Sequence, residues 1–175
     1  WDNDTRHNIP SRYEALCGLC GGEFNESLGV SKPYDFRSWV PDAIVVNLGT
    51  NDASAFEQPP FTIPETGEVC KQRKNPDGTY NREDLLKFEQ AVIDFLKMLR
   101  KHNESSHIVW AYGMLGYDLT LAITEAMNTY RNETGDSNVA FLQLPDSTPD
   151  NLGAHAHPGP ASHERAAAIL TEYFK

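Results

Sequence analysis

The amino-acid sequence predicts an α/β fold, a three-layer α/β/α sandwich built on a parallel sheet. Apolar runs of strand length alternate with stretches of helical periodicity, in the order strand, helix, strand, helix, strand, helix. Such alternation requires right-handed crossovers, which place helices on both faces of a parallel sheet. Ligands of these sheets bind beyond the carboxyl ends of the strands, so functional residues are expected in the segments that follow the strands.

The first strand is predicted from Asp42 to Leu48, after a region rich in loops. Residues 1 to 40 contain many Gly, Asn, Ser and Pro without a sustained period, and we expect loops with one short helix around residues 12 to 16. The 42–48 run is mainly apolar and β-branched, which is typical of a strand buried on both faces of a sheet. A proline-containing loop from 53 to 80 follows, and ordered loops of this length usually have a function.

An amphipathic helix is predicted to begin after Asn81. This residue suits the N-cap position, with Asp84 three residues further on, and an apolar stripe then runs to Leu99. Basic residues near the end of the pattern complement the helix dipole. The remaining elements continue the alternation, with strands at 107–112 and 139–144 and helices at 118–130 and 160–174.

The charge balance argues against a nucleic-acid partner. The 175 residues carry 15 Lys and Arg against 25 Asp and Glu, a formal net charge of -10, which repels a polyphosphate backbone. The basic cluster at residues 71–74 lies in the long loop and is expected to be a solvated face. No apolar run is long enough to predict a membrane span. We therefore expect a single domain without a nucleic-acid or membrane partner.

The cysteines favour an extracellular disulfide. Cys17, Cys20 and Cys70 lack the second ligand pair that a zinc site needs and the strand-to-helix context of a redox pair. The pairing stays open: Cys17 to Cys20, either of these to Cys70, or a bond to polypeptide outside these residues.

Sequence patterns for glycosylation point to the same compartment. Asn-x-Ser/Thr sequences occur at Asn3, Asn25, Asn103 and Asn132, and they favour a glycoprotein of the secretory pathway. Together with the cysteines, they predict a secreted, extracellular protein.

Two polar residues follow predicted strands and are candidates for chemistry. Asn51 comes after a Gly49-Thr50 turn, where its side-chain amide can donate hydrogen bonds to a developing oxyanion. The structural alternative is an Asx turn that closes the strand. His157 precedes the last helix, where its imidazole can act as a general base. The alternative for His157 is a merely exposed loop histidine, but both residues are expected at the same edge of one sheet.

Neighbouring residues offer a metal site and an orienting acid as further alternatives. His155, His157 and His163 could share a metal, but no nearby Asp, Glu or Cys set completes the site, so we predict no metal and no cofactor. His163 is expected to be a packing residue. Asp146 and Asp150 can orient an imidazole only if their loop folds back.

The segments around these residues resemble a known family. The string from Pro41 to Asp52, with the preceding Tyr34-Asp35-Phe36-Arg37-Ser38-Trp39, resembles the third conserved block of the SGNH (GDSL-type) hydrolases, especially the acetyl esterases of carbohydrate esterase family 2. The segment from His157 to Ala166 resembles the final block of that family. The resemblance implies a flavodoxin-like fold.

The same resemblance implies roles for individual residues. Asn51 would donate to the oxyanion near Gly49 and Ala156, and His157 would be the general base. Family members with a full triad carry an Asp two or three residues before that His, where this chain has His155 and Ala154. A Ser-His dyad is therefore expected, with Nδ1 of the imidazole held by a backbone carbonyl or a more distant acid. Ala156 stands where an aromatic residue is common, which alters the expected acyl pocket.

The nucleophile of the family is missing from this sequence. The first block, a Gly-Asp-Ser that follows an apolar strand, and the second block with its oxyanion glycine do not occur; the Gly-Asp-Ser of residues 135–137 precedes a predicted strand instead. No serine present replaces it, because none follows a tight strand-to-helix elbow; these serines include Ser11, Ser27, Ser31, Ser38, Ser54 and Ser162.

We therefore interpret residues 1–175 as the C-terminal portion of a single SGNH hydrolase domain. Its partner would be the N-terminal portion of the same protein, which carries Gly-Asp-Ser, and its substrate an acetylated carbohydrate. The expected function is a serine esterase that removes acetyl or other short acyl groups from carbohydrates. The alternatives are a catalytically inactive SGNH-like module that binds glycans or has a structural role, and a metal-dependent hydrolase.

Overall fold

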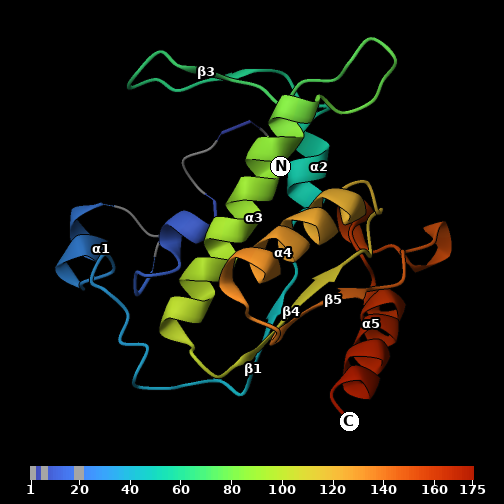
Figure 1. The fold of residues 1–175 in the computed structure, drawn as a ribbon. Helices are drawn as coiled ribbons and strands as arrows, with labels where there is room; N and C mark the ends of the chain where they lie inside the picture. The colour runs from blue at the N-terminus through green and yellow to red at the C-terminus, as the bar shows by residue number, and fades with distance from the viewer. Residues whose placement is uncertain (1–2, 5–7, 18–21) are drawn as a thin grey trace.

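The predicted α/β architecture is confirmed. The structure is a computed structural model that describes residues 3–4, 8–17 and 22–175 (Figure 1). A parallel sheet has the strand order β1-β4-β5, with β1 at Ala43–Val46, β4 at His107–Tyr112 and β5 at Val139–Gln143. The long helices are α3 (Arg82–His102), α4 (Thr120–Thr134) and α5 (Pro160–Tyr173).

Shorter elements occupy the connections. The expected helix near residues 12 to 16 is instead a 3-10 turn, η2 (Pro10–Arg12), followed by the short helix α1 (Glu23–Ser27). The long loop holds a two-stranded ribbon, and two more 3-10 turns precede α5. These elements are α2 (Thr50–Ala55), β2 (Phe61–Thr62), β3 (Val69–Cys70), η3 (Pro149–Asn151) and η4 (Ala154–Ala156).

The helices lie in layers on the two faces of the sheet. Alternate side chains of β4, including Trp110 and Tyr112, join the main core beneath α3 and α4. On the opposite face, Ala111 joins a smaller apolar cluster with Ala166 of α5. Figure 1 shows α3 and α4 packed together on one side and α5 on the other, which completes the three layers.

Local signals explain where the long helices begin and end. The side chain of Asn81 accepts a hydrogen bond from the backbone N–H of Glu83 at 3.1 Å and so caps α3, as predicted. The helix α4 runs beyond its predicted end at Tyr130, because the left-handed residue that stops it is Gly135, with φ 71°. None of the described helices is both long and apolar enough to cross a lipid bilayer.

The prediction that β1 is buried on both faces is wrong. Ile44 and Val46 pack toward the main core, but Val45 on the other face is 44% exposed because α5 does not reach that part of the sheet. Within the part of the chain that the structure describes, no strand pairs with the second edge of β1. One edge and one face of this strand therefore lie uncovered.

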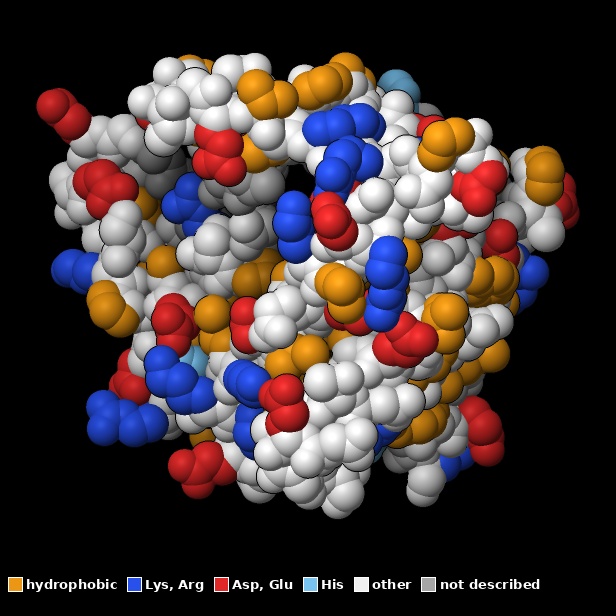
Figure 2. All heavy atoms as spheres, turned by 45° about the horizontal axis from the view of Figure 1, so that its top comes forward, with side chains coloured by type: hydrophobic (Ala, Val, Ile, Leu, Met, Phe, Trp, Pro, Cys, Tyr) orange, Lys and Arg blue, Asp and Glu red, His pale blue; other side chains and the backbone are white. Residues whose placement is uncertain are grey.

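The basic segment of the long loop is a structural anchor, which corrects the expectation of a solvated face. The Lys71 ammonium donates to the carbonyl oxygens of Phe56 and Gln58 at 2.9 and 2.6 Å. The Arg73 guanidinium donates to the buried carboxylate of Asp84 at 2.8 Å. Figure 2 shows Lys and Arg side chains interspersed with Asp and Glu on one face of the molecule rather than gathered into one patch.

The glycosylation prediction is wrong at Asn3 and Asn103. Both side chains are buried, and their amide nitrogens are already used. That of Asn3 donates to the carbonyl oxygens of Ala55 and Pro59 at 3.1 and 3.0 Å, and that of Asn103 donates to the carbonyl oxygen of Leu99 at 2.9 Å. A glycan on either amide would displace these bonds.

Glycosylation at the other two Asn-x-Ser/Thr sequences, those of Asn25 and Asn132, stays a prediction. Asn132 is exposed, and Asn25 is half-buried. Cys20 lies outside the described residues, so the disulfide pairing also stays open.

The Arg73–Asp84 pair predicts acid sensitivity. The guanidinium of Arg73 lowers the pKa of Asp84 to about 2, and the Asp84 side chain is only 3% exposed. A carboxyl whose pKa is lowered on folding stabilises the protein above its unfolded pKa, and this stabilisation is lost as pH falls toward 2. Asp84→Asn should lower the free energy of unfolding at pH 7 by about 2 kcal/mol and flatten its decline below pH 4.

Urea denaturation at pH 7 and pH 3 checks this prediction. Asp94→Asn is the matched control, because Asp94 is an exposed carboxylate on the same helix, and it should change little. Equal unfolding midpoints for Asp84→Asn and the parent at pH 7 would contradict the buried pair.

The buried amide of Asn3 predicts a second stability effect. Its oxygen accepts from the backbone N–H of Gln72 at 2.8 Å, so one side chain joins the N-terminal segment to both ends of the long loop. Asn3→Ala leaves several buried backbone groups without a partner and should destabilise the fold by about 2 kcal/mol. Thermal unfolding measures the effect, with Asn132→Ala as the exposed control; a melting temperature equal to that of the control would refute this role.

Candidate active site

The turn after β1 positions Asn51 at the carboxyl edge of the sheet. Gly49 has φ 125°, and a Cβ at this residue would lie 2.9 Å from the ring of Tyr112, so only glycine fits. Its carbonyl accepts the first helical bond of α2, from the N–H of Ala53 at 2.9 Å. The Gly49 turn thus brings α2 directly against the end of β4.

The side chain of Asn51 is exposed and unused. Within the part of the chain that the structure describes, its amide makes no hydrogen bond, so the alternative Asx turn is not formed. Its two N–H bonds therefore have no acceptor among the described residues, and an incoming ligand can reach them because the side chain is exposed. An exposed side-chain amide of this kind is able to donate to an oxyanion.

The imidazole of His157 is held by the backbone. Its Nδ1 lies 3.1 Å from the carbonyl oxygen of His155. Because a carbonyl oxygen only accepts, Nδ1 carries the proton of the neutral ring, and Nε2 keeps its lone pair. The ring is exposed, and no described serine donates to it. Nε2 is therefore in the form that a general base needs.

The turn that carries His157 is strained. His155 and Ala156 have φ of 53° and 58°, in the left-handed region that costs a non-glycine residue about 1 to 2 kcal/mol. Two backbone bonds close the turn, from the N–H of Gly153 to the His157 carbonyl at 2.6 Å and from the N–H of His157 to the Ala154 carbonyl at 3.1 Å. These two bonds hold the strained turn in place, and with it the ring beside the carbonyl that orients it.

Neither loop acid orients the imidazole. The carboxylate of Asp146 accepts from the backbone N–H groups of Gly116 and Ser147 at 3.0 and 2.9 Å. The carboxylate of Asp150 accepts from the Thr148 hydroxyl at 2.5 Å. The backbone carbonyl is thus the orienting group of His157 in this structure.

A buried polar network supports the His157 loop, and sequence reasoning missed it. The Ser162 hydroxyl donates to the side-chain oxygen of Asn151 at 2.9 Å and accepts from the Ser147 hydroxyl at 2.8 Å. Gly159 donates its N–H to the Asn151 carbonyl, and a Cβ there would come within 2.7 Å of that oxygen. The capping pattern from Thr148 to Asn151 was the available signal. Ser162 is therefore a structural residue.

The loop after β4 is joined to the loop after β5. Met114 is buried in a left-handed conformation with φ 71°, and its carbonyl accepts from the N–H of Ser147 at 3.0 Å. Among the described residues, Met114, His155 and Ala156 are the non-glycine residues with positive φ. All three lie at the carboxyl edge of the sheet, where strained residues are typical of functional sites.

Several alternatives to these candidates are not formed. Burial raises the pKa of Tyr112 to about 12, so its phenol stays protonated at neutral pH and is not a base. The Ser54 hydroxyl donates to the Asn51 carbonyl at 2.9 Å from within α2, where no elbow exposes it.

Over residues 3–4, 8–17 and 22–175, no three His, Cys, Asp or Glu side chains gather closely enough to hold a metal ion. His163 is exposed rather than packed, which corrects that expectation.

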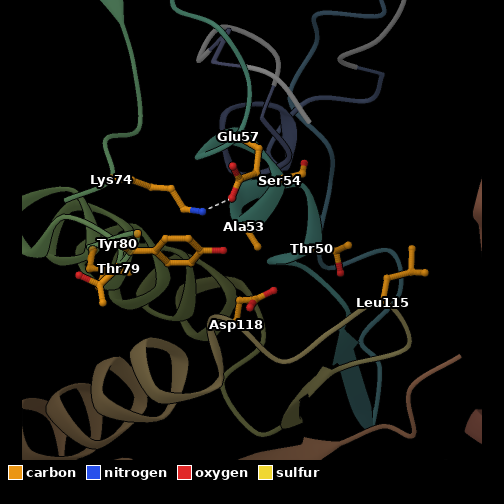
Figure 3. Close-up of a pocket in the computed structure, with 11 residues that line it drawn as sticks. Thr50, Ala53, Ser54, Glu57, Lys74, Thr79, Tyr80, Leu115 and Asp118 are labelled. Atoms are coloured by element: carbon orange, nitrogen blue, oxygen red, sulfur yellow. Dashed lines mark hydrogen bonds and ion pairs between the residues drawn. The ribbon is translucent and has the colours of Figure 1, made fainter. Parts of the chain in front are cut away.

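A hollow of about 650 Å³ adjoins the turn that carries Asn51. It lies between α2, the 74–80 turn of the long loop and the loop that follows β4 (Figure 3). Asn51 and His157 do not line it. Asn51 follows β1 and His157 follows β5. These two strands lie on either side of β4, so the strands are two spacings, or about 10 Å, apart.

Known proteins resemble this chain in sequence and in fold. No family model matches the sequence. The cellulase/esterase CelE of Acetivibrio thermocellus is 28% identical over 148 residues, which cover 81% of this chain and 15% of that protein. The solved structure of an acetyl xylan esterase, Est2A, from the rumen bacterium Butyrivibrio proteoclasticus is 58% identical, with a TM-score of 0.97 over 99% of this chain and 46% of that one.

Two further solved structures are carbohydrate esterase family 2 enzymes. That from Clostridium thermocellum, in complex with cellohexaose, is 25% identical with a TM-score of 0.61 and covers 93% of this chain. That from Corynascus thermopiles (Myceliophthora fergusii), which includes a carbohydrate binding domain, is 21% identical with a TM-score of 0.65 over 97% of this chain and shows the fold alone. The present chain spans less than half of each relative, 46% and 45% respectively. In sequence and in fold, this chain resembles the carbohydrate esterase family 2 enzymes, whose SGNH-type α/β fold it shares along nearly its whole length.

Proposed function

We propose that residues 1–175 are the C-terminal portion of the catalytic domain of a serine esterase that removes acetyl, or other short acyl, groups from carbohydrates. The observation that carries this proposal is the pairing of Nδ1 of His157 with a backbone carbonyl at 3.1 Å, which leaves Nε2 ready to accept a proton. The unused amide of Asn51 lies at the same edge of the sheet and supplies the second component of the chemistry.

The proposed reaction assigns each residue a step. A serine hydroxyl attacks the acyl carbonyl, and Nε2 of His157 takes the hydroxyl proton. The amide of Asn51 donates to the oxyanion of the tetrahedral intermediate. Collapse of the intermediate breaks the ester bond, and His157 returns the proton to the departing sugar hydroxyl. Water then attacks the acyl-enzyme with His157 again as base, which releases acetate and regenerates the serine.

Two further positions belong to this proposal. The backbone N–H of Gly49 would add to the oxyanion site, and Ala156 would border the acyl group. The small side chain of Ala156, which lies next to His157 on the strained turn, leaves room there for a short acyl chain.

The nucleophile is proposed to come from polypeptide that precedes residue 1. The uncovered edge of β1 supports this, since a strand that paired in parallel with it would end at the same edge as Asn51 and His157. Additional polypeptide on this side would also cover apolar residues of β1 and of the segment before it that are exposed here, Val45 and Trp39 among them. The partner is thus the N-terminal portion of the same protein, with Gly-Asp-Ser at its strand end.

The relatives support the proposed substrate class. One of them is named for acetyl xylan and another was solved with cellohexaose, and both resemble this chain in sequence over most of its length. A polymeric substrate of this kind lies outside cells, so a secreted location is part of the proposal.

Labelling of the complete protein with a fluorophosphonate tests the proposal. Mass spectrometry should find the label on a serine upstream of Trp1. Label on a serine within residues 1–175 would overturn the proposed origin of the nucleophile. Absence of label, together with glycan binding, would identify the inactive module, and hydrolysis that a chelator abolishes would identify the metal-dependent alternative.

Substitutions in the complete protein should separate the two roles. His157→Ala removes the general base and should lower kcat about 10³-fold, and Asn51→Ala removes an oxyanion donor and should lower it about 10²-fold to 10³-fold. Steady-state hydrolysis of 4-nitrophenyl acetate measures both. His163→Ala, the exposed histidine of α5, is the control and should retain parental kcat. Parental kcat in His157→Ala would rule out the proposed base.

The orientation of the imidazole predicts its tautomer. Nitrogen-15 NMR of the neutral ring should show the proton of His157 on Nδ1, opposite to the Nε2-protonated form that dominates for free imidazole side chains. The assignment can be made by comparison with His157→Gln. A dominant Nε2-protonated form would contradict the carbonyl contact.

A further inference from the structure

The hollow beside α2 is lined by four parts of the chain, one of which is α3 through Leu85. One face of α2 contributes residues at helical spacing, the 74–80 turn contributes Tyr80, and the loop after β4 contributes Leu115 and Asp118. The residues from α2 and its C-terminal end are Thr50, Ala53, Ser54 and Glu57. Figure 3 shows the Tyr80 hydroxyl and the Asp118 carboxylate directed into the space between these walls.

Three polar groups of the hollow have no hydrogen bond to any other residue that the structure describes. They are the hydroxyls of Thr50 and Tyr80 and the carboxylate of Asp118. Burial, together with the nearby carboxylate of Asp118, raises the pKa of Tyr80, so its hydroxyl stays protonated and can donate. The hollow thus offers a donor, a strong acceptor and a hydroxyl that can do either.

The walls that carry these groups are fixed. The ring of Tyr80 stacks on Phe56 with centroids 4.0 Å apart, and the Lys74 ammonium lies 5.5 Å above the Tyr80 ring. Both faces of the ring are therefore occupied, which leaves its hydroxyl edge for a ligand. The turn itself is held to α3 by Arg73 and Asp84. A ligand here meets positioned groups, which lowers the cost of binding.

The charges favour a neutral ligand rich in hydroxyls. Lys74 pairs with Glu57 across the rim, so these two charges compensate each other. Asp118 remains as an uncompensated negative charge, which repels a carboxylate ligand. Ala53, Leu85 and Leu115 add apolar surface beside the polar groups. A pyranose ring has the same mixture of apolar C–H faces and hydroxyl edges.

The hollow and the proposed catalytic groups share α2. Thr50 lines the hollow, and Asn51 follows it about 100° around the helix, on the adjacent face. A group bound at the Asn51 amide and a ligand in the hollow would therefore contact neighbouring residues of the same helix. The loop that carries Asp118 is in turn bonded to the His157 loop, through Gly116 and Asp146 at 3.0 Å.

We propose that this hollow is a subsite that binds the neutral sugar ring next to the acylated one, with Asp118 accepting from two sugar hydroxyls and Tyr80 donating to a third oxygen. The subsite rests on the proposed function for the identity of its substrate class. It makes Asp118 and Tyr80 determinants of specificity rather than catalytic residues.

Calorimetric titration of the complete protein with xylohexaose tests the subsite directly. Asp118→Asn should weaken the Kd about tenfold or more, and Tyr80→Phe about threefold to tenfold. Asp94→Asn, the same change on an exposed carboxylate outside the hollow, should leave the Kd unchanged. Hexagalacturonic acid should bind more weakly than xylohexaose. Unchanged Kd in both hollow variants, no binding by the parent, or tighter binding of the acidic sugar would overturn the subsite.

Kinetics separate this inference from the proposed function. For the complete protein, the ratio of kcat/KM on an acetylated xylo-oligosaccharide to that on 4-nitrophenyl acetate should fall about tenfold in Asp118→Asn, through KM. If the parent hydrolyses neither ester but the sugar titrations respond as expected, the subsite stands and the esterase proposal fails. If the parent hydrolyses both and the ratio is unchanged, the subsite fails and the esterase proposal stands.

Discussion

Asp84 is buried at the start of α3, and a carboxylate in that position needs a cation. Arg73 supplies it from the end of the long loop, with two further donors to the same site from its own backbone N–H and from Lys87. This interaction ties the long loop to α3 directly before the 74–80 turn of the loop, and so contributes to the position of that turn. The turn carries Tyr80 against Phe56, so this ion pair supports one wall of the hollow beside α2.

The loops that follow β4 and β5 are also held rigidly, although their backbone is strained. Three non-glycine residues with positive φ, each costing about 1 to 2 kcal/mol, are tolerated there because buried hydrogen bonds around them fix the backbone. Ser162 and Asn151 hold the base of the His157 loop, and Met114 is tied to Ser147. Rigid supports on both sides of the edge keep the two candidate catalytic side chains exposed without leaving them on mobile ends.

The fold could be predicted from the sequence because its signals are local and periodic. The strand at 107–112 has the expected bounds, and α3 begins after Asn81 as its cap indicates. The features that sequence reasoning missed depend on contacts between distant residues. No local pattern pairs Arg73 with Asp84, or places the amide of Asn3 against the end of α2. The exposure of Val45 likewise depends on which helix covers which part of the sheet.

The candidate site was predicted as a set of residue types, and its geometry required the structure. Asn51 and His157 could be chosen because both follow strands, but the partner of the imidazole could not, since a backbone carbonyl leaves no trace in a sequence. The hollow was missed for a related reason. Thr50, Tyr80 and Asp118 belong to three separate segments, and none of them is unusual within its own segment.

The group that orients His157 belongs to the main chain, and this has an evolutionary consequence. A side-chain acid can be lost by a single nucleotide change, whereas the carbonyl of residue 155 persists whatever amino acid is encoded there. Residue 155 can therefore vary among amino acids that tolerate its left-handed φ of 53° while the ring keeps its partner. The vulnerable positions become those that set the local path of the backbone, above all Gly159, where any added carbon meets the Asn151 oxygen.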